Sequence, residues 1–223
     1  MIWDMDGLLI DTERISHESW LQASRELGLE IDAVEFRRII GMNEASFREA
    51  LHQAIGDQVD VPELVAQSDR IYHQKIAHGV PLRQGARICI EWLSNEGIPQ
   101  SVATSSRQTL AQKKLGHHDL ICHFHSIVSG DQVTNGKPHP EIFITTAEQM
   151  GVDPSDCLAF EDSRHGVHAA AASGARVILV PDLAIHTDES RGLAHEIWES
   201  LEQGPEKFQE WLSQSTPPIR NSR

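Results

Sequence analysis

The chain has 223 residues, of which 39% are hydrophobic and 23% are charged, a composition typical of a globular protein. Its 19 Lys and Arg residues stand against 33 Asp and Glu residues, which gives a net charge of −14. So acidic a surface repels nucleic acid, and the apolar runs are far shorter than the roughly 18 residues of a membrane-spanning helix. We therefore expect neither nucleic acid nor membrane as a partner. Three Cys without paired spacing and no export signal at the start favour a cytoplasmic location.

Short apolar strands alternate with helices along most of the chain. After a first strand over 1–4, the pattern predicts helices over 85–96, 107–115, 140–150 and 166–173, separated by strands over 99–104, 126–129, 157–160 and 176–180. A last helix is predicted over 205–212, followed by a frayed tail over 213–223. This alternation predicts an α/β fold, with a Rossmann-like parallel sheet as its core and helices on both faces of the sheet.

One long segment breaks the alternation. Four helices are predicted in succession over 15–27, 32–40, 44–55 and 62–78, with no strand between them. The simplest arrangement is an all-helical domain inserted after the first strand, with the sheet resuming afterwards. We therefore predict a core of residues 1–13 and 81–223 and a helical domain of residues 14–80.

Two carboxylates follow the first strand. Asp4 and Asp6 are two residues apart, so in an extended chain their side chains point the same way. Their mutual repulsion favours a divalent cation with oxygen ligands, and Gly7 permits the sharp turn that follows. Taken alone, this motif is more often a solvated turn than a metal site.

Hydroxyl groups and a lysine lie in two later loops. Thr104, Ser105 and Ser106 join the strand over 99–104 to a helix, where free N–H groups and hydroxyls form an anion site. Capping of that helix by Ser105 or Ser106 is the alternative. Lys137 lies between a Gly and a Pro just before the next helix, so the backbone fixes its position. We interpret it as a positioned cation.

Glu161 and Asp162 follow another buried strand, and the carboxyl ends of parallel strands share the edge where ligands bind. In chain order, the acid pair, the hydroxyl, the Lys and the second acid pair resemble the motifs of the haloacid dehalogenase superfamily of phosphohydrolases. The resemblance covers residues 1–13 and 82–182. Asp-Met-Asp-Gly-Leu-Leu-Ile-Asp-Thr-Glu, Gly-Lys-Pro-His-Pro and Phe-Glu-Asp-Ser look most like the subgroup with a helical cap. That subgroup contains β-phosphoglucomutase and small-metabolite phosphatases, and residues 14–80 occupy the place of its cap.

The resemblance implies catalytic roles for the first acid pair. Asp4 would attack phosphorus and form an aspartyl-phosphate, and Asp6 would protonate the leaving oxygen and then accept a proton from water. Mg²⁺ would be held by the Asp4 side chain, the Asp6 main-chain carbonyl and Asp162. Glu161 is a further candidate ligand, ranked below Asp162.

The resemblance also implies a substrate site. Thr104, Lys137 and the main-chain N–H of Ser105 would bind the oxygens of the transferring phosphoryl group. The expected substrate is a small phosphorylated metabolite, and sugar, polyol and nucleoside phosphates all remain open. We take a monomer as the default.

Two other functions remain as alternatives. The sugar-phosphate mutases of this subgroup carry a His near position 16 and an Arg after a Gly of the cap, whereas this chain has Ser16 and Glu44, with His17 one residue away. This favours hydrolysis over a hexose-phosphate mutase. A non-catalytic phospho-acceptor or scaffold protein is an alternative of another class, against which the helical insertion and Lys137 argue.

Several other residues invite a functional interpretation but favour a structural one. The stretch over 117–125 contains four His and one Cys, at His117, His118, Cys122, His123 and His125, without the pairing typical of a zinc site. Arg37, Arg38 and Arg48 fit solvated helix positions, and Trp20 and Trp92 fit the core.

Overall fold

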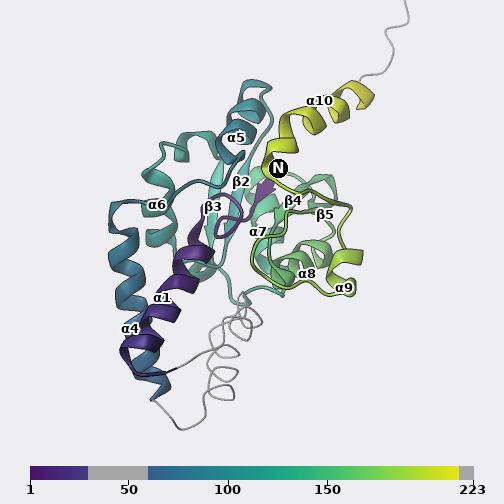
Figure 1. Cartoon of the computed structure of the whole chain (residues 1–223). Coiled ribbons are helices and arrows are strands. Elements are labelled where there is room, and N and C mark those ends of the chain that lie inside the picture. The colour runs from purple at the N-terminus through teal and green to yellow at the C-terminus, as the bar shows by residue number, and fades with distance from the viewer. Residues whose placement is uncertain (30–59, 216–223) are drawn as a thin grey trace, which may run out of the picture.

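A six-stranded sheet forms the centre of the computed structural model, which describes residues 1–29 and 60–215 (Figure 1). Its strands are β1 (Ile2–Trp3), β2 (Ser101–Thr104), β3 (Ser126–Ser129), β4 (Leu158–Glu161), β5 (Arg176–Leu179) and β6 (Glu196–Ile197). They lie in the order β3-β2-β1-β4-β5-β6, and every neighbouring pair is parallel. The predicted Rossmann-like parallel sheet is confirmed. The two-residue strand β6 was not predicted, because so short a strand has no recognisable periodicity.

Helices connect the strands in the order that the sequence predicts. They are α1 (Thr12–Glu26), α4 (Val61–Lys75), α5 (Ala86–Asn95), α6 (Gln108–Gly116), α7 (Glu141–Met150), α8 (Arg164–Ala172), α9 (Asp188–Gly192) and α10 (Gly204–Ser215). Helix α8 begins two residues before the prediction, because the Ser163 side chain caps it by accepting a hydrogen bond from the Gly166 N–H. Helix α10 continues to Ser215, past the predicted start of the tail, and α9 was not predicted. The helices predicted over 32–40 and 44–55 lie outside the described residues.

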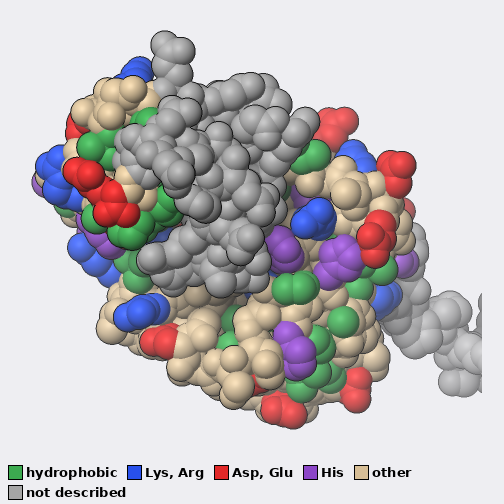
Figure 2. Space-filling model, turned by 90° about the horizontal axis from the view of Figure 1, so that it is seen from below, with side chains coloured by type: hydrophobic (Ala, Val, Ile, Leu, Met, Phe, Trp, Pro, Cys, Tyr) green, Lys and Arg blue, Asp and Glu red, His purple; other side chains and the backbone are tan. Residues whose placement is uncertain are grey.

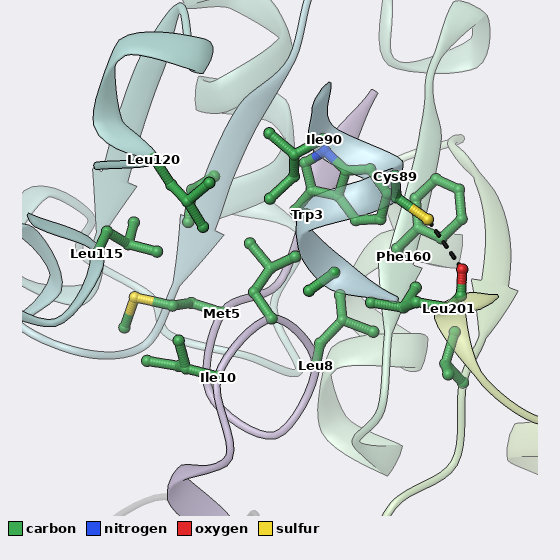
Figure 3. Close-up of a cluster of buried hydrophobic side chains, with 14 of the residues drawn as sticks. Trp3, Met5, Leu8, Ile10, Cys89, Ile90, Leu115, Leu120, Phe160 and Leu201 are labelled. Carbon is green, nitrogen blue, oxygen red and sulfur yellow. Dashed lines mark hydrogen bonds between the residues drawn. The ribbon is translucent and has the colours of Figure 1, made fainter. Parts of the chain in front are cut away.

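The two faces of the sheet support separate hydrophobic clusters, because successive strand residues point to opposite faces. In β1, Ile2 belongs to the cluster under α7 and α8, whereas Trp3 belongs to the larger cluster under α5, α6 and α10. Figure 3 shows this larger cluster, in which Trp3 and Phe160 stack with their ring centres 4.2 Å apart. Each such fully buried side chain contributes roughly 1.5–3 kcal/mol, so the clusters hold the strand ends rigidly in place.

Helices α1 and α4 pack against each other away from the sheet (Figure 1). The chain leaves the sheet through residues 9–11 and returns through residues 81–83, and backbone hydrogen bonds of 2.8 and 2.9 Å join these two connections. Asp182 lies beside them and pairs with Arg14 at 2.9 Å and with Arg83 at 3.0 Å. The entry and the exit of the helical segment are therefore tied to each other and to the core.

Acidic and basic side chains are interspersed on the face that is seen from below (Figure 2). Within the described ranges, none of the helices has both the length and the apolar character needed to span a bilayer.

Candidate active site

The carboxyl ends of β1, β2 and β4 lie side by side at the centre of the sheet. Trp3 of β1 is in register with Val102 of β2 and with Phe160 of β4. Asp4 therefore leaves β1 at the level where Glu161 ends β4, and Thr104 ends β2 one residue further on. The strand order reverses its direction at β1, and ligands of open α/β sheets bind at such a point. The topology thus brings together residues that are more than 150 positions apart in the sequence.

Lys137 links three of these segments through its ammonium group. The Nζ atom donates hydrogen bonds to Asp4 Oδ1 at 2.5 Å, to Glu161 Oε1 at 2.6 Å and to the Ala103 carbonyl at 3.1 Å. Burial opposes protonation of this side chain, but the charges of Asp4 and Glu161 outweigh it and raise the pKa of Lys137. Lys137 is therefore a fixed cation at the end of β1, although it comes from the loop before α7.

Three buried carboxylates cluster at this edge of the sheet. Oxygen atoms of Asp4, Glu161 and Asp162 all lie within 4.8 Å of one another. Burial raises the pKa of Asp4 and of Asp162, and the neighbouring carboxylates raise both further; Lys137 opposes the shift at Asp4. In the described part of the chain, Lys137 thus pairs with two of these three acids, and the cluster holds more acidic groups than cations.

The residues present fit a divalent cation with oxygen ligands. Glu161 is fully engaged: one oxygen binds Lys137, and the other accepts hydrogen bonds from the N–H groups of Asp162 and Ser163 and from the Ser163 hydroxyl. Asp162 Oδ1 is buried and has no hydrogen-bond partner among the described residues. A buried polar atom without a partner is costly, and a bound cation would satisfy it. This favours Asp162 over Glu161 as a ligand.

The turn after β1 depends on a glycine. Gly7 has a φ of +88°, and a Cβ atom at this position would lie 2.1 Å from Asp162 Oδ2. The missing side chain therefore allows the turn to approach the carboxylate cluster closely.

Asp6 lies in a different environment from Asp4. Its Oδ1 accepts hydrogen bonds from Lys114 Nζ at 2.6 Å and from the Thr12 hydroxyl at 2.9 Å. Its Oδ2 accepts from the Ser106 hydroxyl at 2.7 Å and from the Thr104 hydroxyl at 3.2 Å. Burial opposes the ionisation of Asp6, but the charge of Lys114 and these hydrogen bonds outweigh it and lower the pKa of Asp6. The pKa values of Asp4 and Asp6 are thus shifted in opposite directions.

Three of the residues that hold Asp6 were not singled out for this role by sequence reasoning. Ser106 was considered as a helix cap, but Arg107 is the N-cap of α6, and the Ser106 hydroxyl binds Asp6 instead. Thr12 begins α1 and carried no distinctive signal. Lys114 carried a recognisable signal, because it lies on the buried stripe of α6 that also includes Ala111. Ser105, the expected main-chain donor, directly follows β2 and is exposed.

A cavity of about 270 Å³ opens between the core and the helical pair. The residues that line it include Asp6, Ser106 and Lys114 from the core, and Ser16 and Tyr72 from the two helices. A molecule bound there contacts Asp6, in the turn after β1, on one side and α1 and α4 on the other.

The other candidates from the sequence have structural surroundings. His118, His123 and His125 form hydrogen bonds to the Val80 carbonyl, the Ser94 hydroxyl and the Gln149 carbonyl, respectively. Trp20 is buried and Trp92 packs against the larger core cluster. The arginines at 37, 38 and 48 and Glu44 lie outside the described residues.

Comparison with known proteins agrees with this geometry. The family model described as haloacid dehalogenase-like hydrolase matches residues 1–180. A phosphorylated carbohydrates phosphatase of Thermotoga maritima is 32% identical over 177 residues, which cover 78% of this chain and 81% of the relative. The β-phosphoglucomutase of Bacillus subtilis is 29% identical over 216 residues, which cover 89% of this chain and 95% of that protein.

Among solved structures, a haloacid dehalogenase-like protein of unknown function from Agrobacterium tumefaciens superposes with a TM-score of 0.80 and 25% identity. The superposition covers 95% of this chain and 97% of that one. The resemblance drawn from the motifs is confirmed: this chain belongs to the haloacid dehalogenase-like hydrolase family.

Proposed function

We propose that this protein is a Mg²⁺-dependent phosphatase that hydrolyses a small phosphorylated metabolite through an aspartyl-phosphate on Asp4. The observation that carries the proposal is the position of Lys137, which pairs with Asp4 and Glu161 beside the oxygen of Asp162 that has no partner within residues 1–29 and 60–215. A nucleophilic carboxylate, a fixed cation and a site for a second cation are what phosphoryl transfer requires. The similarity to a phosphorylated carbohydrates phosphatase supports the same activity.

The two aspartates divide the chemistry between them in this proposal. A carboxylate oxygen of Asp4 attacks phosphorus, and the bond from phosphorus to the alkoxide oxygen of the substrate breaks. Asp6, whose pKa is lowered in the free protein, must take up a proton before this step; it then gives that proton to the leaving oxygen and later regains one from the water that hydrolyses the acyl phosphate.

The phosphoryl group is held by the surrounding residues. Thr104, Lys137 and the main-chain N–H of Ser105 bind its oxygens, and the lysine reduces the repulsion between Asp4 and the substrate dianion. Asp4, the Asp6 main-chain carbonyl and Asp162 would hold Mg²⁺, with Glu161 contributing through Lys137 and the following backbone. When bound, Mg²⁺ supplies positive charge that neutralises the developing charge on the phosphoryl oxygens.

We assign residues 14–80 to a cap domain and residues 1–13 and 81–223 to the catalytic core. Packing of α1 against α4 and the paired connections at 9–11 and 81–83 support this division. A cap that closes over the cavity excludes bulk water while the phosphoryl group is transferred.

Hydrolysis is favoured over isomerisation by one residue of the cavity. Ser16 lines it near the place where the mutases of the subgroup carry a His, with His17 next to it in the sequence, and a serine hydroxyl is a far weaker base than an imidazole. The 29% identity to a β-phosphoglucomutase keeps the mutase as the second candidate. The proposal extends to a cytoplasmic monomer that acts on a free metabolite.

A panel of phosphorylated metabolites, assayed with Mg²⁺ for released phosphate, tests the activity. Asp4→Asn is expected to reduce turnover by roughly 10³-fold or more, because the nucleophile is lost. Asp156→Asn, the same change at an exposed position, is the matched control and is expected to keep full turnover. Full turnover by Asp4→Asn would contradict the mechanism. An isomerised phosphosugar in place of free phosphate would identify the protein as a mutase. Mg²⁺ binding without turnover of any compound would identify it as a phospho-acceptor.

A further inference from the structure

The peptide group of Asp162 lies just beyond the end of the sheet. The pairing of β4 with β5 ends at Glu161, whose carbonyl accepts a hydrogen bond from the Val180 N–H at 2.8 Å. Helix α8 begins only after Ser163, which is its N-cap. Asp162 therefore belongs to neither element, although it carries a carboxylate that we assign to the cation. Main-chain groups outside regular structure need other partners, and these partners fix their orientation.

A histidine side chain from a later loop supplies such a partner. His186 Nε2 lies 2.8 Å from the main-chain carbonyl oxygen of Asp162. A carbonyl oxygen can only accept a hydrogen bond, so this nitrogen carries the hydrogen and donates it. The described structure supplies this carbonyl with a side-chain donor and with no main-chain donor. The Asp162 N–H donates in turn to Glu161 Oε2 at 3.1 Å, so both main-chain polar groups of Asp162 are engaged.

The imidazole of His186 is held in place by the start of α9. The Thr187 side chain caps this helix by accepting a hydrogen bond from the Ser190 N–H. Ser190 is fully buried, and its hydroxyl donates to the Thr187 carbonyl at 3.0 Å and lies 3.5 Å from His186 Nδ1. The half-buried ring therefore reaches Asp162 from a fixed position.

The carboxylate of Asp162 has little room and little support of its own. A Cβ atom at Gly7 would clash with Asp162 Oδ2, so the turn after β1 passes directly beside that oxygen. The other oxygen, Oδ1, is buried and has no hydrogen-bond partner within residues 1–29 and 60–215. With no donor at Oδ1 in this part of the chain, the direction of that oxygen depends on the main chain that carries it.

We propose that His186 is a positioning residue of the cation site, and that its hydrogen bond to the Asp162 carbonyl holds the Asp162 carboxylate where it can bind Mg²⁺. The inference rests on the proposed function, in which Asp162 is a ligand of that ion. Groups that orient metal ligands contribute roughly tenfold to 100-fold to metal affinity without touching the ion. The role requires a donor at the place of Nε2 and does not depend on the charge of the imidazole.

Binding of Mn²⁺ to the protein without substrate tests this role. Mn²⁺ accepts the same kind of oxygen ligands as Mg²⁺, and the EPR signal of the free ion gives its dissociation constant directly. Wild type is compared with His186→Phe, which fills the space of the ring without a donor, and with His186→Gln, whose amide nitrogen reaches the place of Nε2. His125→Phe is the matched control. His125 Nε2 also lies close to a main-chain carbonyl, that of Gln149 at 3.0 Å, but it precedes β3 and is therefore at the opposite edge of the sheet.

We expect His186→Phe to raise the dissociation constant of Mn²⁺ by roughly tenfold to 100-fold. His186→Gln should stay within about threefold of wild type because it keeps the donor, and His125→Phe should bind as wild type. Thermal unfolding in chelator shows whether each variant is folded. If His186→Phe does not fold, His186→Leu takes its place, because it is smaller and also lacks a donor.

The outcomes separate this inference from the proposed function. An unchanged dissociation constant in His186→Phe would overturn the role of His186 alone. So would an equal loss of affinity in His186→Gln, because the donor would then not matter, or in His125→Phe, because the loss would then follow from weaker folding in general. If wild type does not bind Mn²⁺ and Mg²⁺ does not stimulate phosphate release, the proposed cation site itself is wrong, and this inference is wrong with it.

Discussion

Replacing Asp162 by Asn should stabilise the metal-free protein and abolish its response to Mg²⁺. Asp162 is buried beside two other carboxylates, and its Oδ1 has no hydrogen-bond partner in the described structure. Burial and the charges of Asp4 and Glu161 both raise the pKa of Asp162, so its ionised form is unfavourable. An asparagine has nearly the same shape and removes the charge.

The magnitude follows from the spacing of the acids. Two unit charges 4.8 Å apart repel by about 3.5 kcal/mol at an effective dielectric constant of about 20, and Asp162 faces two such charges. The oxygens lie no farther apart than this, but a carboxyl group in this position relieves the repulsion by taking up a proton, which reduces the net effect. We expect a net gain of about 2 kcal/mol in the free energy of unfolding, which corresponds to roughly 4–8 °C in a chain of this size.

The assay is thermal unfolding at pH 7.5, first with a chelator and then with Mg²⁺. In wild type, Mg²⁺ at about 100 times its dissociation constant should stabilise the fold by about 2.7 kcal/mol, or roughly 5–10 °C. Asp162→Asn should unfold at a higher temperature than wild type in chelator and should gain almost no stability from Mg²⁺. Asp156→Asn should behave as wild type. A variant that unfolds earlier than wild type in chelator, or that keeps the full Mg²⁺ shift, would refute the charge argument.

Two further predictions concern other ionisable groups. Burial, together with the charges of Asp6 and Asp182, raises the pKa of Glu13 to about 7. Because the pKa of Glu13 is higher in the folded than in the unfolded state, the stability of the metal-free protein should fall as pH rises from about 4.5 to 7. In urea titrations, Glu13→Gln should then be about 2 kcal/mol more stable than wild type at pH 8. A difference in stability between the two proteins that does not change with pH would speak against this. Burial also raises the pKa of the Cys89 thiol to about 12, and Cys157 is buried too, so a thiol reagent at pH 8 should modify Cys122 in the native chain and all three thiols in denaturant.

The sheet and the candidate residues at its carboxyl edge could be predicted from the sequence because their signals are local. Asp4, Lys137 and Asp162 each follow a recognisable strand or precede a helix, and parallel strands must bring their carboxyl ends to one edge. The prediction needed no knowledge of side-chain contacts. The same topological rule places Thr104 beside them.

The surroundings of Asp6 could not be predicted in this way, because they depend on packing between distant segments. Lys114 reaches Asp6 across 108 positions of sequence, and nothing local distinguishes it from the exposed Lys113 except its place on the helix stripe. Ser106 had two possible uses, and only the position of Asp6 decides between them. The short elements α9 and β6 were missed because they span too few residues to show periodicity.

The paired connections at 9–11 and 81–83 have a consequence for how such a chain can vary. Their backbones are already hydrogen-bonded to each other, so the sheet side of the molecule is closed off before the helical segment begins. A segment of different length or sequence can be grafted between those two points without moving the ends of β1, β2 or β4. If this segment is the proposed cap, selectivity toward one metabolite or another would be exchanged as a module, while the phosphoryl chemistry beneath it stays in place.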